Sequence, residues 1–242
     1  MRIPTSHHRG ILVAVLAFST PAAAQAPTPL TADDRSAIQA LVTDYARALA
    51  GCNAEQYADL FAPDNGYFAS GIRGQVVGHE RLVALVQSER HCTAPAGTAA
   101  ATRPGGTNGP TVTLEATSSG VRGIADLGGA GEYQDEYVKT PKGWRFASRA
   151  VLVPAEKAAG LDAREMLAIQ RLAGSELGDF YVPDQSGIKR LRTSGVAINV
   201  SAGAITGRAY LKSGGYYDDV YEKIGPGQWR IKSRALVPAA TP

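Results

Sequence analysis

The sequence predicts an α+β fold over residues 31–154: a cone-shaped barrel in which three helices cover a curved antiparallel sheet. Apolar residues recur at helical spacing in the first part of this region, and four later segments alternate apolar and polar residues between glycines. The sequence of the sheet then returns near the C-terminus. Residues 155–242 are therefore predicted to form a truncated half-barrel repeat, with one helix and an antiparallel sheet.

Residues 1–24 have the layout of a cleaved secretory signal. Arg2 and Arg9 lie in a basic start, an apolar run covers residues 11–18, and small residues at 22–24 offer a cleavage site. The apolar run is too short to anchor the protein in a bilayer. We expect a periplasmic or secreted protein with no membrane association after cleavage, and a linker over residues 25–30.

The three helices are expected within residues 31–90. Thr31 is a hydroxyl cap for the first helix, and Asn53 begins a capping box for a short second one. The third helix is expected to start at residues 78–80. Residues at helical spacing should face the core in the first helix (Ile38, Leu41, Val42, Tyr45, Leu49) and in the third (Leu82, Leu85, Val86).

Five segments of the first unit are predicted to be strands: 67–70, 111–115, 121–127, 132–139 and 144–153. The last four are separated by glycines and short polar turns, which favours an antiparallel meander.

The last two of these strands are repeated, and so is the sequence upstream of them. Gly-Ile-Ala-Asp-Leu at 123–127 returns as Gly-Arg-Ala-Tyr-Leu at 207–211, and Thr-Asn-Gly at 107–109 returns as Thr-Ser-Gly at 193–195. Residues kept in both copies are Tyr133/Tyr217, Asp135/Asp219, Tyr137/Tyr221, Trp144/Trp229, Ser148/Ser233 and Arg149/Arg234. Because the second copy has one predicted helix and no complete cone, these residues are expected to be framework. A half-barrel leaves an apolar sheet face open. The second unit should therefore pack against the first or against a partner, either sheet on sheet or as a lid over the mouth.

Composition excludes several classes of function. The formal net charge is +3 and no basic run occurs, so we expect no nucleic-acid partner. The sequence has no glycine-rich phosphate loop, nucleophile elbow or clustered metal-ligand motif, so no cofactor and no metal are predicted. The two cysteines, Cys52 and Cys92, favour a disulfide in an oxidising compartment, with a metal pair as the weaker alternative.

Several motifs together resemble a known family. They are Asp-Arg-Ser-Ala-Ile-Gln-Ala-Leu at 34–41, Tyr-Ala-Asp-Leu-Phe-Ala-Pro-Asp at 57–64, Val-Gly-His-Glu-Arg-Leu at 77–82 and Gly-Glu-Tyr-Gln-Asp-Glu-Tyr-Val at 131–138. Residues 31–154 resemble the SnoaL-like branch of the nuclear transport factor 2-like superfamily. The resemblance implies a cone-shaped cavity, frequent homo-oligomers and often cofactor-free elimination, dehydration, isomerisation or aldol-type chemistry.

Many catalytic members of that branch use an Asp–His dyad, which this chain lacks. Ala50 stands at the Asp position, and Arg103 or Pro104 stands at the His position. The departure argues against dyad-type dehydratases and leaves either a different catalytic set or no catalysis.

Four residues are the catalytic candidates. Tyr67 lies where the branch commonly places a cavity aromatic, although a core tyrosine is the alternative. Histidine side chains titrate near neutrality, so His91 can act as a general base, unless it is a surface residue. Arg103 offers a fixed charge to a developing anion, unless it is a solvated loop residue. Glu132 is an acid/base candidate if its strand face lines the cavity, and a solvated outer residue otherwise.

Four further residues are candidates for substrate binding: Tyr45 on the first helix, Arg73 at a hairpin tip, Asn108 in a turn and Gln134 beside Glu132.

The sequence thus leads to a cofactor-independent lyase acting on a small hydrophobic or aromatic molecule. One concrete form, akin to cofactorless diarylpropane formaldehyde lyases, is deformylation of a lignin-derived diarylpropane diol. A non-catalytic ligand-binding or assembly protein is the rival class, and a steroid- or polyketide-type isomerase or cyclase is the third.

Overall fold

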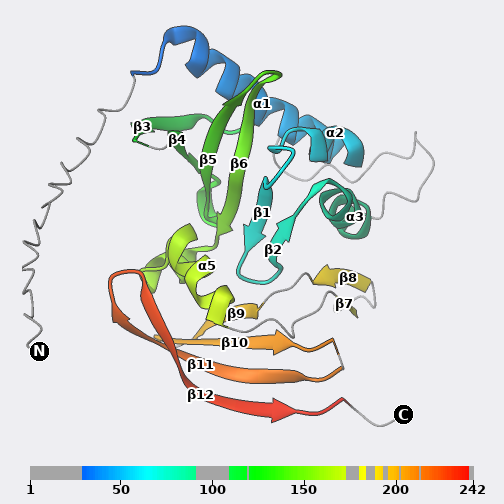
Figure 1. Cartoon of the computed structure of the whole chain (residues 1–242), viewed down its shortest axis with the longest axis vertical. Coiled ribbons are helices and arrows are strands. Elements are labelled where there is room, and N and C mark those ends of the chain that lie inside the picture. The colour runs from blue at the N-terminus through cyan, green and yellow to red at the C-terminus, as the bar shows by residue number, and fades with distance from the viewer. Residues whose placement is uncertain are drawn as a thin grey trace, which may run out of the picture.

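The computed structural model describes residues 29–90, 109–118, 120–172, 180–183, 189–192, 196–201, 203–212 and 214–239. These residues form a mixed α+β structure with two larger sheets and a separate hairpin. Helix α5 lies between the two sheets (Figure 1).

Three helices form in the first unit: α1 (Ala32–Ala50), α2 (Ala54–Asp59) and α3 (His79–Arg90). The predicted caps are present. The Thr31 hydroxyl accepts from the Asp34 amide, and the Asp34 carboxylate accepts from the Thr31 amide. Asn53 Oδ1 accepts from the Gln56 amide at 3.1 Å. Each cap satisfies amide groups that have no partner within the helix, which fixes where the helix begins.

The first sheet has six strands in the order β2-β1-β6-β5-β4-β3. They are β1 (Tyr67–Ser70), β2 (Gly74–Val77), β3 (Val112–Thr117), β4 (Gly120–Asp126), β5 (Glu132–Thr140) and β6 (Gly143–Leu152). Strands β3 to β6 form the predicted antiparallel meander, and a 3-10 turn (Gly128–Ala130) joins β4 to β5. Strand β1 pairs with β6 in parallel and with β2 in antiparallel orientation, which extends the meander.

The inner face of this sheet packs against α1, α2 and α3. The predicted stripe on α1 is buried apart from Leu49, which is partly exposed. The three predicted residues of α3 are buried as well. Aromatic side chains of α1, α2 and the sheet join them in one core: Tyr45, Tyr57, Phe61, Tyr137 and Phe146.

The second unit begins with α4 (Pro154–Ala158) and α5 (Ala163–Leu172). A two-stranded hairpin, β7 (Phe180–Pro183) and β8 (Lys189–Arg192), precedes a four-stranded antiparallel sheet. That sheet has the order β12-β11-β10-β9 and consists of β9 (Val196–Ser201), β10 (Ala204–Tyr210), β11 (Tyr216–Gly225) and β12 (Gln228–Val237). Helix α4 and the β7–β8 hairpin were not predicted from the sequence.

Helix α5 is the second unit's copy of α1, which sequence reasoning did not recognise. Residues 30–41 align with residues 161–172 without a gap. The two segments are Leu-Thr-Ala-Asp-Asp-Arg-Ser-Ala-Ile-Gln-Ala-Leu and Leu-Asp-Ala-Arg-Glu-Met-Leu-Ala-Ile-Gln-Arg-Leu. The caps correspond as well, because the Glu165 amide donates to the Asp162 carboxylate at 2.8 Å. By contrast, three residues (193–195) separate β8 from β9, where residues 78–111 separate β2 from β3. The second unit therefore has no room for a copy of α3.

Helix α5 and the second sheet pack on the outer face of the first sheet, while strand β8 contacts α3. Ala150 and Leu152 of β6 lie in one buried cluster with Met166 and Ile169 of α5 and with Ile198 of β9. The open apolar face of the half-barrel is thus covered by α5 and by the first unit (Figure 1). Of the two expected arrangements, this is sheet on sheet, with a helix between, and not a lid over the first unit's inner face.

Candidate functional site

A buried arginine lies at the centre of the first unit's inner face. The Arg149 side chain on β6 is fully buried and donates to Asp135 on β5 through Nε at 2.9 Å and Nη2 at 2.7 Å. The Tyr137 hydroxyl donates to the same carboxylate at 2.6 Å. Burial acts first to lower the pKa of Arg149, but Asp135 overcomes it and the net pKa is raised, so the guanidinium stays charged.

Three aromatic rings surround this guanidinium. Its central carbon lies 4.2 Å from the ring centroid of Tyr45, 4.1 Å from that of Tyr133 and 4.3 Å from that of Phe146. Ring faces carry partial negative charge and attract a cation that has left water. The third nitrogen, Nη1, is buried and has no hydrogen-bond partner among the described residues. Its two N–H groups therefore have no acceptor among the described residues.

Tyr45 on α1 and Tyr57 on α2 form a hydroxyl pair beside Arg149. Burial raises the pKa of both phenols, and the bond between them raises that of Tyr45 and lowers that of Tyr57. Arg149 and Arg73 also lower the pKa of Tyr57 through their charge. The net pKa of Tyr57 is raised, so its phenol stays protonated and can act as a neutral donor. We call Tyr45, Tyr57 and Arg149 the tyrosine–arginine centre.

The second unit repeats only part of this centre among the described residues. Arg234 donates to Asp219 at 2.7 and 2.8 Å, lies 4.4 Å from the Tyr217 ring, and shares Asp219 with the Tyr221 hydroxyl. The duplicated Arg–Asp–Tyr set occupies the same strand positions in each sheet. The Arg–Asp–Tyr set is therefore common to both units, and among the described residues the Tyr45–Tyr57 pair is what the first unit adds.

Three sequence candidates lie on the opposite, outer face of the first sheet. The Glu132 carboxylate pairs with Lys157 of α4 and accepts from Gln134 Nε2 at 2.8 Å, and Gln134 Oε1 accepts from the Ala163 amide of α5 at 2.9 Å. Tyr67 packs against the buried cluster around α5 and bonds to Ser148. Both interpretations of the strand face were wrong: Glu132 and Gln134 neither line the inner face nor point into solvent, because they hold α4 and α5 in place.

The other sequence candidates divide into two groups. Tyr45 lies in the tyrosine–arginine centre. Arg73 lies at the β1–β2 turn, where its amide donates to Ser70, and its charge lowers the pKa of Tyr57. His91, Arg103 and Asn108 lie outside the described residues. Cys52 is disulfide-bonded, and Cys92, its expected partner, lies outside the described residues.

Sequence reasoning missed two members of the centre. Tyr57 was not among the candidates, and Arg149 was assigned to the framework. A signal for Arg149 was available, because an arginine recurs between serine and alanine on a strand in both copies. Tyr57 had no such signal, since its contact with Tyr45 depends on the packing of two helices.

Neither a metal cluster nor a membrane helix is found in the part of the chain that the structure describes. No three His, Cys, Asp or Glu side chains there gather closely enough to hold a metal ion. No described helix combines the length and the hydrophobicity needed to cross a bilayer.

Comparison with known proteins gives one family match, because residues 30–150 match the model of the SnoaL-like domain. No curated protein matches the chain. Among solved structures, the chain is similar to an NTF2-like protein with a cystatin-like fold from Novosphingobium aromaticivorans. The two are 24% identical, the match covers 52% of this chain and 88% of that chain, and the TM-score is 0.36. It is also similar to a domain of unknown function with a cystatin-like fold from Nostoc punctiforme, with 14% identity, 58% and 94% covered, and a TM-score of 0.36.

Proposed function

The chain belongs to the SnoaL-like domain family, in which isomerases and cyclases occur, and on this premise we propose that it is a cofactor-independent enzyme acting on a small hydrophobic or aromatic molecule. The proposed reaction class is a lyase or an isomerase. Because this fold carries many functions, the proposal rests on the tyrosine–arginine centre and not on the fold.

The observation that supports catalysis is the Tyr45–Tyr57 pair beside the Arg149 guanidinium. Eliminations, isomerisations and aldol-type cleavages all build negative charge on an oxygen in the transition state. Tyr57 can donate a proton or a hydrogen bond to such an oxygen, while the Tyr45 hydroxyl and the charges of Arg149 and Arg73 stabilise the resulting phenolate. A site of this kind works by placing donors where charge develops, which needs neither a metal nor a cofactor.

The surrounding side chains favour an aromatic substrate. Tyr45, Tyr57, Phe61 and Phe146 form a connected set of rings, with centroids 5.1 to 6.5 Å apart in the contacting pairs. Rings of this kind pack edge-to-face or offset against another ring. A planar aromatic molecule is therefore the substrate class that we propose.

The most concrete form of the proposal is deformylation of a diarylpropane diol. The benzylic carbon–oxygen bond breaks and Tyr57 protonates the departing hydroxyl, which leaves as water. A base takes the proton of the hydroxymethyl group, formaldehyde leaves, and the electron pair of the broken carbon–carbon bond becomes the new double bond. Asp135 is held by Arg149 and Tyr137, and Glu132 lies on the outer face. We propose His91 for the base.

One observation favours the rival class, a non-catalytic ligand-binding protein. Tyr45 and Tyr57 are 4% and 1% exposed, and Arg149 is enclosed by rings, so the centre has the packing of a protein core. A group buried in this way stabilises a fold even when it performs no chemistry.

The test compares turnover between two matched variants. The purified protein is incubated with a panel of aromatic diols and β,γ-unsaturated ketones, and the conjugated product is followed by ultraviolet absorbance. Tyr57→Phe keeps the ring and removes the donor, so we expect turnover to fall by about 10²-fold. Tyr67→Phe makes the same change on the outer face and should leave turnover within about twofold.

Equal rates in the wild type and Tyr57→Phe would contradict the site assignment. Binding of panel members without product would favour the ligand-binding protein. Production of a conjugated ketone with no formaldehyde released would identify an isomerase in place of the deformylating lyase.

We also propose that the enzyme acts in the periplasm or outside the cell, as a homo-oligomer. The N-terminal signal layout supports export, and the family resemblance supports association. Cell fractionation and light scattering of the purified protein test these two points separately.

A further inference from the structure

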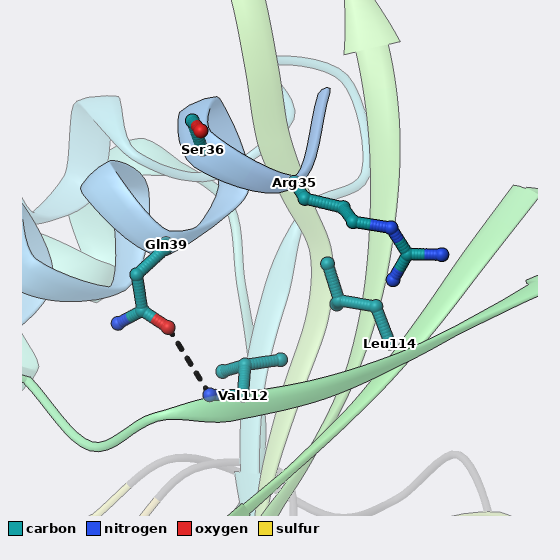
Figure 2. Close-up of a pocket in the computed structure, with 5 residues that line it drawn as sticks. All are labelled: Arg35, Ser36, Gln39, Val112 and Leu114. Atoms are coloured by element: carbon teal, nitrogen blue, oxygen red, sulfur yellow. Dashed lines mark hydrogen bonds between the residues drawn. The ribbon is translucent and has the colours of Figure 1, made fainter. Parts of the chain in front are cut away.

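A surface groove lies between α1 and β3, the edge strand of the first sheet. Its volume is about 460 Å³. Arg35, Ser36 and Gln39 of α1 form one wall, and Val112 and Leu114 of β3 form the other (Figure 2). We call it the α1–β3 groove. It lies outside the tyrosine–arginine centre.

The second unit contains the same groove. In the ungapped alignment of α1 with α5, the three helix residues correspond to Met166, Leu167 and Gln170. On the strands, Leu114 pairs with Gly123 and Ile198 pairs with Gly207, and each glycine lies under the ring of the repeated tyrosine. Val112 and Leu114 thus correspond to Val196 and Ile198, so every lining residue has a counterpart.

In the second unit this groove is filled by the first unit's β1–β2 turn. Gln170 Nε2 donates to the Ser70 carbonyl at 3.2 Å, and the Ile198 amide donates to the Gly71 carbonyl. All five counterpart residues are buried there. The chain itself therefore shows what such a groove accepts: a stretch of backbone that presents its carbonyls to the edge strand.

The α1–β3 groove offers the same backbone group. Val112 directs its amide out of the sheet, because it donates to Gln39 Oε1 at 3.1 Å (Figure 2). Residues two apart on an antiparallel strand direct their amides the same way, so the Leu114 amide also points out of the sheet. It stands where the Ile198 amide stands in the filled groove. An outward edge amide of this kind is a template for a further strand.

The two grooves differ in charge. Arg35 and Ser36 replace Met166 and Leu167, so the open groove has an exposed cation where the filled one has apolar side chains. Arg35 forms no ion pair among the described residues. Asp33, two residues earlier, lies on another side of the helix and does not neutralise it. The cation favours a partner that carries a carboxylate at this point.

We propose that the α1–β3 groove binds an extended segment of a partner polypeptide, which adds to β3 at Leu114 and places a carboxylate beside Arg35. The backbone bonds supply the register, the side chains of Val112 and Leu114 supply apolar contact, and Arg35 selects acidic segments. This site is independent of the proposed catalytic function.

The test uses two capped hexapeptides of equal length and otherwise of valine, one with aspartate at its two central positions and the other with lysine there, so that one charge faces the groove whichever face of the strand binds. Binding is followed by backbone amide resonances of the full mature protein. The aspartate peptide should shift the Leu114 amide and its neighbours on β3, and the lysine peptide should bind at least about tenfold more weakly. Arg35→Glu should reverse this preference. Lys142→Glu makes the same charge change on the exposed β5–β6 turn and should leave it unaltered.

Shifts confined to other surfaces, or no shifts at millimolar peptide, would overturn the proposal. Equal binding of both peptides, or a preference that survives in Arg35→Glu, would overturn the role of Arg35. Because no step uses turnover, these outcomes do not depend on whether the protein is an enzyme.

Discussion

Glu165 on α5 occupies in the second unit the position that Asp34 on α1 occupies in the first. Asp34 accepts from the Trp144 indole at 3.0 Å and pairs with Lys139 at 2.9 Å. Glu165 accepts from the Trp229 indole and pairs with Lys223 at 2.8 Å. In each unit one carboxylate in the first turn of a helix fastens that helix to the last two strands of its sheet.

These two carboxylates should make stability fall in acid. Bonds from Lys139, Thr31 and Trp144 lower the pKa of Asp34. Burial alone would raise the pKa of Glu165, but the bonds from Lys223, Trp229 and Gly227 outweigh it and the net shift is downward. A depressed pKa stabilises the folded state above the ordinary carboxyl pKa, and that contribution is lost as pH falls.

We therefore expect Glu165→Gln to lower the free energy of unfolding by about 1–2 kcal/mol at pH 7 and by less in acid. Urea unfolding at several pH values measures this. Tryptophan fluorescence of a Trp144→Phe background reports the second unit alone, since Trp229 is then the remaining tryptophan. A loss that is equal at every pH would contradict the linkage.

Removing Arg149 should cost more than removing its copy. Arg149→Met leaves Asp135 buried and unpaired, so we expect a loss of about 3–5 kcal/mol in the free energy of unfolding. The Arg234 side chain is 26% exposed, so water can partly replace it at Asp219 and Arg234→Met should cost about 1–3 kcal/mol. Denaturant unfolding of the two variants side by side checks the order. Equal losses would show that burial does not set the cost.

Gly123 should not tolerate a side chain. A Cβ there would lie 2.7 Å from Tyr137 Cε2 and 2.7 Å from Val112 Cγ1, so Gly123→Ala must displace a buried ring that also bonds to Asp135. We expect a loss of about 1–3 kcal/mol. Gly129→Ala is the matched control, since nothing lies within 4 Å of a Cβ there, and it should change stability by less than about 0.5 kcal/mol. Thermal unfolding by circular dichroism compares the two.

Glu156 should act in the opposite sense to Asp34 and Glu165. Burial raises the pKa of its carboxyl group, against a hydrogen bond from the Val153 amide. A raised pKa favours the protonated folded state, so its contribution is present at low pH and is lost as pH rises through the folded pKa. Glu156→Gln should therefore gain stability relative to the wild type as pH rises from about 4 to 7. Glu80→Gln, an exposed control on α3, should show no such gain in stability with pH. The urea midpoints of both variants and the wild type across this pH range test the prediction.

The sequence by itself determined the elements and the repeat. Helical stripes, caps and strand alternation are local patterns, because backbone hydrogen bonds and side-chain direction act over a few residues. They placed α1, α2, α3 and the meander within a few residues, and the family resemblance supplied the cone. The ungapped match of α1 with α5 is also present in the sequence. Its significance follows from the structure, in which both helices contact their sheets in the same way.

The tertiary structure alone decided which face each strand residue serves. Alternation shows that Glu132, Gln134 and Tyr67 lie on one face and Tyr133 and Asp135 on the other, but it does not show what covers either face. Helix α5 and the second sheet cover the outer one, which removes the first three from the inner site. The contact of Tyr57 with Tyr45, and the contrast between a filled and an open groove, likewise depend on packing between segments far apart in the chain, and no local pattern records such packing.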